Sequence, residues 1–214
     1  DLHSFPTRRS SDLVVVALLA SPGVCAACAA RLPEVVYLPG GEAWSRAALE
    51  EAPFFAAAVV GPGLGRASAA LDAVRELWIR WPKPLLVDGD GLFALSVPAA
   101  DVCLPRGDAV LTPHEGEAAR LLGTTAEAVR GDRLGTARRL ADRWGCVLLK
   151  GNPTIAARRG AAAVFCLRWG GPELSVPGSG DVLSGCIGAF LAAGLEAWDA
   201  ALRSEEHTSE LQSR

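Results

Sequence analysis

Short, continuous apolar runs that alternate with longer amphipathic segments restrict the fold of this chain more than any other feature. An uninterrupted apolar run of this kind is typical of a strand buried on both faces of a parallel sheet. Such strands are predicted at residues 14–20, 34–38, 56–60, 85–87, 109–111 and 146–149. Helices are predicted at 21–32, 43–51, 67–81, 115–122 and 126–144, and an antiparallel hairpin at 155–157 and 162–166. The alternation predicts an α/β domain with a largely parallel central sheet and helices on both faces.

The composition and charge of the 214 residues exclude several classes of protein. Hydrophobic residues make up 50% of the chain and charged residues 21%, as in a globular domain rather than a disordered one. Because the net charge is −3 and no basic patch is present, the chain is not expected to bind nucleic acid. No apolar run approaches the roughly 20 residues that span a bilayer, so no membrane association is expected.

The six cysteines favour a reducing compartment, so we expect a cytoplasmic protein. Most of them lie inside apolar runs, where cysteine behaves as a small hydrophobic residue. Cys25 and Cys28 have the spacing of a redox or zinc motif, but no second cysteine pair or histidine pair accompanies them. We therefore interpret these two residues as packing residues of the helix predicted at 21–32.

The two ends of the chain differ from the sequence between them. Residues 1–13 and 203–214 resemble in-frame translations of sequencing adapters, so we expect both to be non-native tails; a pair of natural polar tails is the alternative. Residues 14–202 are then the natural sequence. Because the chain contains no methionine, we expect it to be a fragment of a longer gene product. Such a fragment should be less stable than its parent, and inactive if the missing ends complete the site.

The stretch 177–185, with the sequence PGSGDVLSG, has the features of an anion-binding loop at the start of a helix. Its glycines let backbone N–H groups converge, and the N-terminus of the following helix adds partial positive charge. Asp181 is predicted as the first helical residue, where its carboxylate could act as a base beside the anion. These residues indicate phosphoryl chemistry, with a phosphate on the loop and Asp181 acting on the attacking group.

Two further polar segments follow predicted strands, at the edge of the sheet where α/β proteins bind ligands. The glycine loop 61–65 matches neither a P-loop nor a dinucleotide-binding fingerprint, so a phosphate cradle and a plain tight turn both remain open. Asp88 and Asp90 follow the next strand. They could bind a metal, orient a hydroxyl group or, in the case of Asp90, cap the following helix.

His114 and the segment 150–154 follow the next two strands along the chain. His114 is the only histidine within residues 14–202, and a lone histidine rarely forms a metal site. We interpret it as a hydrogen-bonding group in a ligand pocket, with N-capping and packing as the alternatives. Lys150 could meet a phosphate as a point charge and Thr154 offers a hydroxyl group, although a solvated turn also explains this segment.

Five motifs in one order resemble a known family. The segments GPGLG, DGDGL, TPHEGEAARLLG, LKGNPT and PGSGDVLSG are similar to those of the ADP-dependent NAD(P)H-hydrate dehydratases, which belong to the ribokinase-like superfamily. The chain departs from the usual motifs at Gly89, Phe93, Glu115 and Gly171, where the family usually has Ala, Asn, Pro and Asn. We also expect the chain to lack the family's N-terminal segment, which completes the substrate site, and its C-terminal helices.

The resemblance implies a hydro-lyase that repairs hydrated NADH and NADPH at the expense of ADP. Asp181 would be the catalytic base. The substrate would lie against Gly63, Gly65, Asp90, His114 and Asp181. The nucleotide would lie against Lys150, Gly151, Asn152, Pro153, Thr154, Gly178, Ser179 and Gly180. Mg²⁺ is expected to accompany the nucleotide, with no dedicated protein site. The family also implies a homo-oligomer, namely a tetramer, and a parent that could carry an N-terminal epimerase domain.

Two other functions stay open. A ribokinase-like small-molecule kinase, for example of a vitamin-precursor alcohol, shares the glycine-loop aspartate and would accumulate a phosphorylated product. A nucleotide-binding remnant without catalysis would keep only the fold. The residues do not predict a preference between the NADH and NADPH hydrates, or between ADP and ATP.

Overall fold

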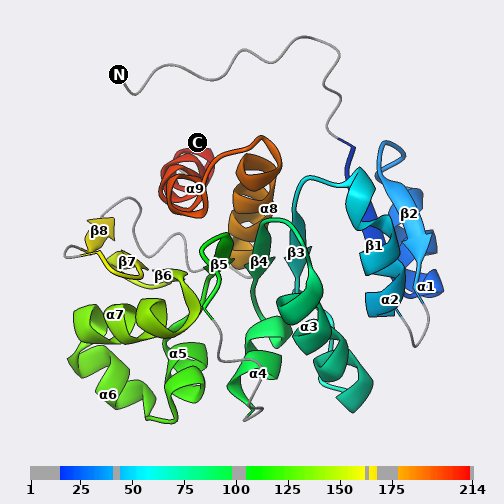
Figure 1. Cartoon of the computed structure of the whole chain (residues 1–214). Helices are drawn as coiled ribbons and strands as arrows, with labels where there is room; N and C mark the ends of the chain where they lie inside the picture. The colour runs from blue at the N-terminus through cyan, green and yellow to red at the C-terminus, as the bar shows by residue number, and fades with distance from the viewer. Residues whose placement is uncertain (1–14, 41–43, 98–104, 162–163, 168–177, 213–214) are drawn as a thin grey trace. The chain divides into compact units, whose positions relative to one another are not determined.

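The computed structural model describes residues 15–40, 44–97, 105–161, 164–167 and 178–212 (Figure 1). The chain divides into two compact units, Asp1–Ala48 and Leu49–Arg214. The first unit contains a pair of strands and the second contains a six-stranded sheet. None of the helices in the described ranges is long and apolar enough to cross a membrane.

In the first unit, two parallel strands are connected by a helix. These elements are β1 (Ala17–Ala20), α1 (Pro22–Ala29) and β2 (Val36–Pro39). The hydroxyl group of Ser21 caps α1 by accepting a hydrogen bond from the N–H of Val24, at 3.4 Å. The next helix, α2 (Trp44–Glu51), begins in the first unit and ends in the second.

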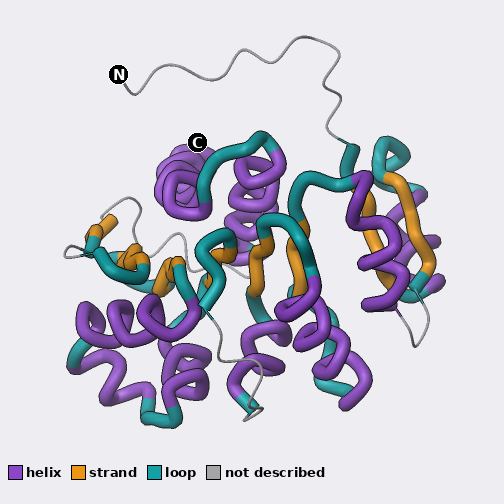
Figure 2. The backbone as a smooth tube through the Cα atoms, viewed as in Figure 1, coloured by secondary structure: helices purple, strands orange, loops and turns teal. Residues whose placement is uncertain are grey.

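The second unit is built on one mixed sheet, whose strands are orange in Figure 2. In spatial order these are β3 (Ala58–Val60), β4 (Leu85–Val87), β5 (Ala109–Leu111), β6 (Cys146–Leu149), β7 (Thr154–Arg158) and β8 (Phe165–Leu167). Strands β3 to β6 are parallel, whereas β7 and β8 are antiparallel to their neighbours. The structure therefore confirms the predicted α/β class, the largely parallel sheet and the antiparallel hairpin.

Helices cover both faces of this sheet (Figure 1). They are the 3₁₀-helix η1 (Ala52–Phe54), α3 (Ser68–Arg80), α4 (Asp90–Ser96), α5 (Glu115–Leu122), α6 (Ala126–Gly131), α7 (Arg133–Trp144), α8 (Ser179–Ala192) and α9 (Ala197–Gln212). On one face, α8 and α9 pack over the sheet, where Leu183 and Ile187 join Leu86, Val110 and Leu148 in a fully buried cluster. On the other face, α7 packs on β6 and β7.

Helix α1 ends at Ala29 and not at residue 32 as predicted, and two other predicted helix boundaries are wrong for a local reason. The single helix predicted at 126–144 is divided at Asp132, whose backbone is not helical and whose carboxylate caps α7 by accepting from the N–H of Gly135, at 2.9 Å. Helix α8 begins at Ser179 with Gly178 as its N-cap, so Asp181 is the third helical residue and not the first. The glycine at position 178 has a φ of 91° and allows this earlier start.

Helix α9 continues past residue 202, where we expect the natural sequence to end. Ser204 and Glu205 are both buried in the second unit. Burial raises the pKa of Glu205, and a hydrogen bond with the side chain of Thr154 lowers it by a smaller amount. The fold therefore accommodates the first residues of this segment, while its adapter origin stays a prediction.

Replacing Glu205 by Gln is expected to stabilise the fold at neutral pH. A carboxyl group whose pKa is raised in the folded state binds its proton more tightly there than in the unfolded chain. The stability of the fold therefore falls as the pH rises above the ordinary range of a glutamate. Gln keeps a polar partner for Thr154 but has no charge to desolvate. Urea unfolding should show a gain that is small at about pH 4 and larger at about pH 8.

The matched control is Glu127→Gln. Glu127 is exposed, and its pKa is lowered by hydrogen bonds with its own backbone N–H and with Thr125 and by the charge of Arg130. Its neutralisation should therefore give no gain in stability at either pH. An equal gain at both pH values for Glu205→Gln would contradict the assignment of the effect to the buried charge.

Candidate active site

The carboxyl ends of β3 to β6 are joined by backbone hydrogen bonds, so the segments that follow these strands lie at one edge of the sheet. The N–H of Asp88 donates to the carbonyl of Val60 at 3.1 Å, and the N–H of Lys150 donates to the carbonyl of Pro113 at 2.8 Å. This is the edge at which the sequence places a ligand site.

Asp90 fastens the glycine loop 61–65 to the end of β4. One carboxylate oxygen accepts from the N–H of Gly65 at 2.9 Å, and the other accepts from Nε of Arg66 at 2.8 Å. The hydrogen bond from Arg66 lowers the pKa of Asp90; burial opposes it by a smaller amount, and the bond from Gly65 adds a further, still smaller lowering. The alternative of Asp90 as a helix cap is wrong, because Gly89 occupies the N-cap of α4 without a side-chain bond and Asp90 is the first helical residue.

Phe93 stands where the resembled family usually has Asn, and it organises two arginines at the same edge. The guanidinium carbon of Arg66 lies 4.5 Å from the centre of the Phe93 ring, and that of Arg120 lies 5.3 Å from it. Arg66 is thus held both by the ring and by Asp90. The departure from the motif at position 93 thus replaces the side-chain amide of Asn with an aromatic ring that contacts two guanidinium groups.

His114 is the N-cap of α5. Its Nδ1 accepts from the N–H of Gly116 at 3.0 Å and from that of Glu117 at 3.4 Å, while the Glu117 carboxylate accepts from the N–H of His114 at 2.8 Å. N-capping, the less favoured of our interpretations, is therefore shown. Because Nδ1 is used in the cap, only the Nε2 edge, 3.5 Å from Oε1 of Glu117, is left for a ligand.

Arg133 anchors the segment 150–154 to the start of α5. It donates to the carbonyls of Lys150 and Pro153 at 3.3 and 3.0 Å, and it pairs with Glu115 at 2.5 Å. Glu115 is a second departure from the family motif, and here it supplies the carboxylate for this anchor. The buried Oγ1 of Thr154 lies 3.1 Å from the carbonyl oxygen of Gly151, and its single hydrogen is shared between this turn and the Glu205 carboxylate.

Asp88 joins three separate elements beneath the start of α8. Its Oδ1 accepts from Nζ of Lys150 at 2.9 Å, and its Oδ2 accepts from Oγ of Ser184 at 2.8 Å. The ammonium group also lies beside Gly180, since a Cβ added there would be 3.4 Å from Nζ. Lys150 and Gly180 are therefore brought together as predicted, by a carboxylate that we did not include among the predicted binding residues. Its signal was present in the DGDG sequence after β4.

The first turn of α8 combines free backbone donors with an exposed carboxylate. The first intrahelical bond of this turn runs from the N–H of Val182 to the carbonyl of Gly178, at 3.1 Å, so the N–H groups before it have no intrahelical partner. Asp181 is exposed and has no hydrogen-bond or ion-pair partner among the described residues. The turn can therefore hold an anion through its N–H groups while Asp181 accepts a proton.

The predicted substrate residues are brought together only in part. Gly65 and Asp90 are in contact, whereas a Cβ added at Gly63 would meet no atom within 4 Å, and no described contact joins Gly63 to Asp181. Pro177 and Gly171 lie outside the described residues. Within the described ranges, no group of three or more His, Cys, Asp or Glu side chains gathers as a metal site.

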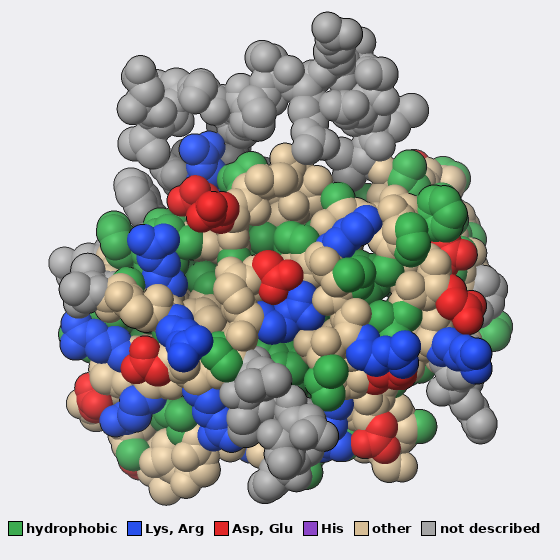
Figure 3. Space-filling model, in the orientation of Figure 1, with side chains coloured by type: hydrophobic (Ala, Val, Ile, Leu, Met, Phe, Trp, Pro, Cys, Tyr) green, Lys and Arg blue, Asp and Glu red, His purple; other side chains and the backbone are tan. Residues whose placement is uncertain are grey.

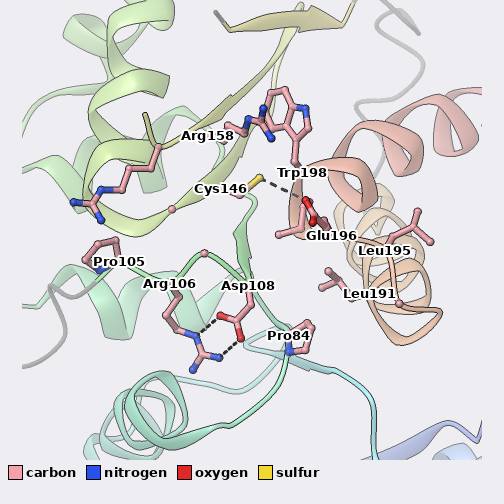
Figure 4. Close-up of a pocket in the computed structure, with 15 residues that line it drawn as sticks. Pro84, Pro105, Arg106, Asp108, Cys146, Arg158, Leu191, Leu195, Glu196 and Trp198 are labelled. Carbon is pink, nitrogen blue, oxygen red and sulfur yellow. Dashed lines mark hydrogen bonds and ion pairs between the residues drawn. The ribbon is translucent and has the colours of Figure 1, made fainter. Parts of the chain in front are cut away.

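A cavity of about 570 Å³ lies at the opposite edge of the same sheet, around the amino ends of β4 to β6 (Figure 4). It is lined by the Arg106–Asp108 ion pair, by Arg158 and Trp198, whose guanidinium group and ring are in contact, and by Cys146. Burial raises the pKa of the Cys146 thiol to about 12. No predicted site residue lines this cavity.

On the face drawn in Figure 3, basic and acidic side chains are interspersed rather than gathered by sign.

Solved structures share this fold. An ADP/ATP-dependent NAD(P)H-hydrate dehydratase from Bacillus subtilis superposes with a TM-score of 0.76 at 24% identity, over 94% of this chain and 73% of that one. Phosphomethylpyrimidine kinase from Clostridium difficile superposes with a TM-score of 0.57 at 16% identity, over 92% of this chain and 100% of that one. At these identities the likeness shows the ribokinase-like fold alone.

Sequence relatives are more similar. The chain is 46% identical over 154 residues to a bifunctional NAD(P)H-hydrate repair enzyme of Thermanaerovibrio acidaminovorans, covering 71% of this chain and 29% of that protein. It is 40% identical to an ADP-dependent (S)-NAD(P)H-hydrate dehydratase of Neisseria meningitidis, covering 67% of this chain and 49% of that protein. The chain thus spans less than half of the length of either relative. The NAD(P)H-hydrate dehydratase family model matches residues 7–211, so the chain belongs to the NAD(P)H-hydrate dehydratase family.

Proposed function

We propose that this chain forms catalytic parts of an enzyme that dehydrates (6S)-hydrated NADH or NADPH back to NADH or NADPH, converting ADP to AMP and phosphate. Family membership supports the reaction class, and the relative from Neisseria meningitidis bears the name of this activity. The observation that carries the proposal is the first turn of α8, where backbone donors, the Lys150 ammonium beside Gly180 and the exposed Asp181 meet the needs of phosphoryl transfer.

The chemistry needs a phosphate because the C6 hydroxyl group of the hydrated ring is a poor leaving group. In the proposed first step, Asp181 takes the hydroxyl proton while the oxygen attacks the β-phosphorus of ADP, and the bond to the α-phosphate oxygen breaks to release AMP. The N–H groups of Gly178 to Asp181 stabilise the charge on the transferred group. In the second step the ring nitrogen supplies the electron pair that expels phosphate, and loss of the C5 proton restores the dihydropyridine.

The two ligands are proposed to lie on opposite sides of Asp181. Lys150 to Thr154, with Gly178, Ser179 and Gly180, hold the nucleotide. Gly63, Gly65, Asp90 and His114 face the hydrated nicotinamide, His114 through its Nε2 edge. The contact between Gly65 and Asp90 and that between Lys150 and Gly180 support this division.

Mg²⁺ is proposed to arrive with the nucleotide. The absence of a cluster of metal-binding side chains among the described residues means that they fit no dedicated protein cage. Mg²⁺ is commonly held by substrate phosphates and water with few protein ligands, so the ion would be bound mainly through the phosphates of the nucleotide. The bound ion would neutralise phosphate charge. We also propose that ATP can replace ADP, since the Bacillus subtilis structure was co-crystallised with ATP and Mg²⁺.

Several properties of the whole protein are also proposed. The bifunctional relatives suggest a parent with a second domain, for which an N-terminal epimerase is our proposal, and a tetramer is expected from the family.

We propose a cytoplasmic location because the described cysteines, namely Cys25, Cys28, Cys146, Cys166 and Cys186, are free thiols. Cys25 is buried in α1, in keeping with a packing role. Residues 1–13 and 203–214 remain proposed as non-native tails around a partial domain at 14–202.

The reaction can be tested on the complete reading frame that contains this sequence. Purified protein is incubated with hydrated NADH and ADP, and the absorbance of reduced nicotinamide is followed. We expect the absorbance to return only when ADP and protein are both present. Phosphorylation of a vitamin-precursor alcohol, with no recovery of reduced nicotinamide, would favour the alternative function of a small-molecule kinase. Phosphomethylpyrimidine kinase, which shares this fold, is an example of such a kinase. Nucleotide binding with neither activity would indicate a non-catalytic remnant.

A further inference from the structure

We propose that Asp88 is a positioning residue that holds the ammonium group of Lys150 against the first turn of α8, where the nucleotide phosphates are proposed to lie. This inference rests on the proposed function for the identity of the ligand, ADP. The contacts that support it, however, are between residues of the chain itself.

Asp88 is the most buried carboxylate of this edge, with 5% of its side chain exposed. A carboxylate removed from water needs partners for both oxygens, and Asp88 has them in Lys150 at 2.9 Å and Ser184 at 2.8 Å. Ser184 belongs to α8, one turn after Gly180. The carboxylate therefore fixes the end of β6 to the helix that carries the anion-binding turn.

Lys150 gains a defined position from this contact. A lysine side chain is a flexible stem with a strongly hydrated charge, which loses rotamer freedom when it is held. Here one N–H of the ammonium group is bound to Asp88, and Nζ lies beside Gly180. The side chain remains 22% exposed, so its other N–H donors can still reach a ligand.

The charges explain why the two residues must act together. An unpaired carboxylate beside the α8 turn would repel a phosphate, whereas Lys150 balances it and leaves the helix N-terminus to attract the anion. Removal of Lys150 alone leaves the buried carboxylate of Asp88 without its counter-charge, as in any buried ion pair that loses one partner. That carboxylate would then repel the phosphates of ADP. Asp88 should therefore help ADP binding when Lys150 is present and oppose it when Lys150 is absent.

A double-mutant cycle on ADP affinity tests this directly in the full chain, with folding of each variant checked by thermal unfolding. Asp88→Asn is expected to weaken ADP binding about tenfold with Lys150 present and to strengthen it several-fold in the Lys150→Ala background. A merely structural role of Asp88 would weaken binding by the same factor in both backgrounds. The latter result, or tighter binding of ADP by Asp88→Asn alone, would overturn the inference.

Two further variants keep the test decisive. Ser184→Ala keeps the charge of Asp88 and removes only one hydrogen bond that holds it, so it should weaken ADP binding about threefold when Lys150 is present and change it little in the Lys150→Ala background, where there is no ammonium group to position. It replaces Asp88→Asn if that protein does not fold. Asp90→Asn is the matched control from the same motif, because Asp90 pairs with Arg66 and its effect should be the same in both backgrounds. If the wild type binds no ADP, the proposed function fails together with this inference, whereas equal effects in both backgrounds overturn the inference alone.

Discussion

Replacing Asp181 by Asn is expected to lower the turnover of hydrated NADH about a thousandfold, while ADP affinity changes by less than about threefold. Asn keeps the shape of the side chain and its place as the third residue of α8, but it cannot take the proton of the attacking hydroxyl group. The exposed carboxylate has no described partner that its loss would leave unpaired, so the fold should be little affected. Steady-state rates and calorimetric ADP binding on the complete protein measure the two effects.

Asp199→Asn is the matched control for this prediction. Asp199 is exposed and is the third residue of α9, the same helical position that Asp181 has in α8. The two substitutions remove the same charge from the same place in a helix, so they should have similar small effects on stability. Only the change in α8 should affect turnover. Unchanged turnover in Asp181→Asn would refute its assignment as the base.

Replacing Gly61 by Ala is expected to destabilise the second unit by about 4 kcal/mol or to prevent its folding. Gly61 has a φ of 118°, which L side chains rarely adopt, and a Cβ there would lie 1.9 Å from the backbone carbonyl oxygen of Asp88. The backbone of the glycine loop approaches the end of β4 so closely that no side chain fits between them. Denaturant unfolding of the purified variant, or its soluble yield, measures the effect.

Gly63→Ala separates the steric clash from the cost of the backbone angle. Gly63 also has a positive φ, of 64°, but a Cβ there would meet no atom within 4 Å. Its replacement should cost about 1 kcal/mol, as for other residues in the left-handed region. Equal losses of stability at the two positions would show that close approach to β4 is not what requires Gly61.

The central strands were predictable because their apolar runs are short and are buried on both faces. The predicted strands 85–87, 109–111 and 146–149 coincide with β4, β5 and β6. Helix boundaries were less predictable where a local hydrogen bond overrides the apolar spacing, as at Asp132. For His114, the sequence did contain the missed signal, because a Glu three residues after a cap residue forms a capping box.

Partners that are distant along the chain could not be derived from the sequence. Asp88 is 62 positions from Lys150 and 96 from Ser184, so only the folded sheet and α8 bring the three side chains together. The same holds for Arg133, which pairs with Glu115 and donates to the carbonyl of Pro153. The sequence showed Glu115 only as a departure from the family motif, whereas the structure shows that it helps to hold the segment after β6. Motif order predicted which segments meet at this edge, and the structure supplied the side-chain pairs.

Phosphorus NMR of the complete protein with hydrated NADH and ADP tests the dehydratase assignment most directly. The signals of ADP should be replaced by those of AMP and inorganic phosphate in equal amounts, with one NADH formed for each phosphate. A phosphorylated organic product that persists, or consumption of ADP without NADH, would contradict the proposal that the phosphate is attached only to be expelled.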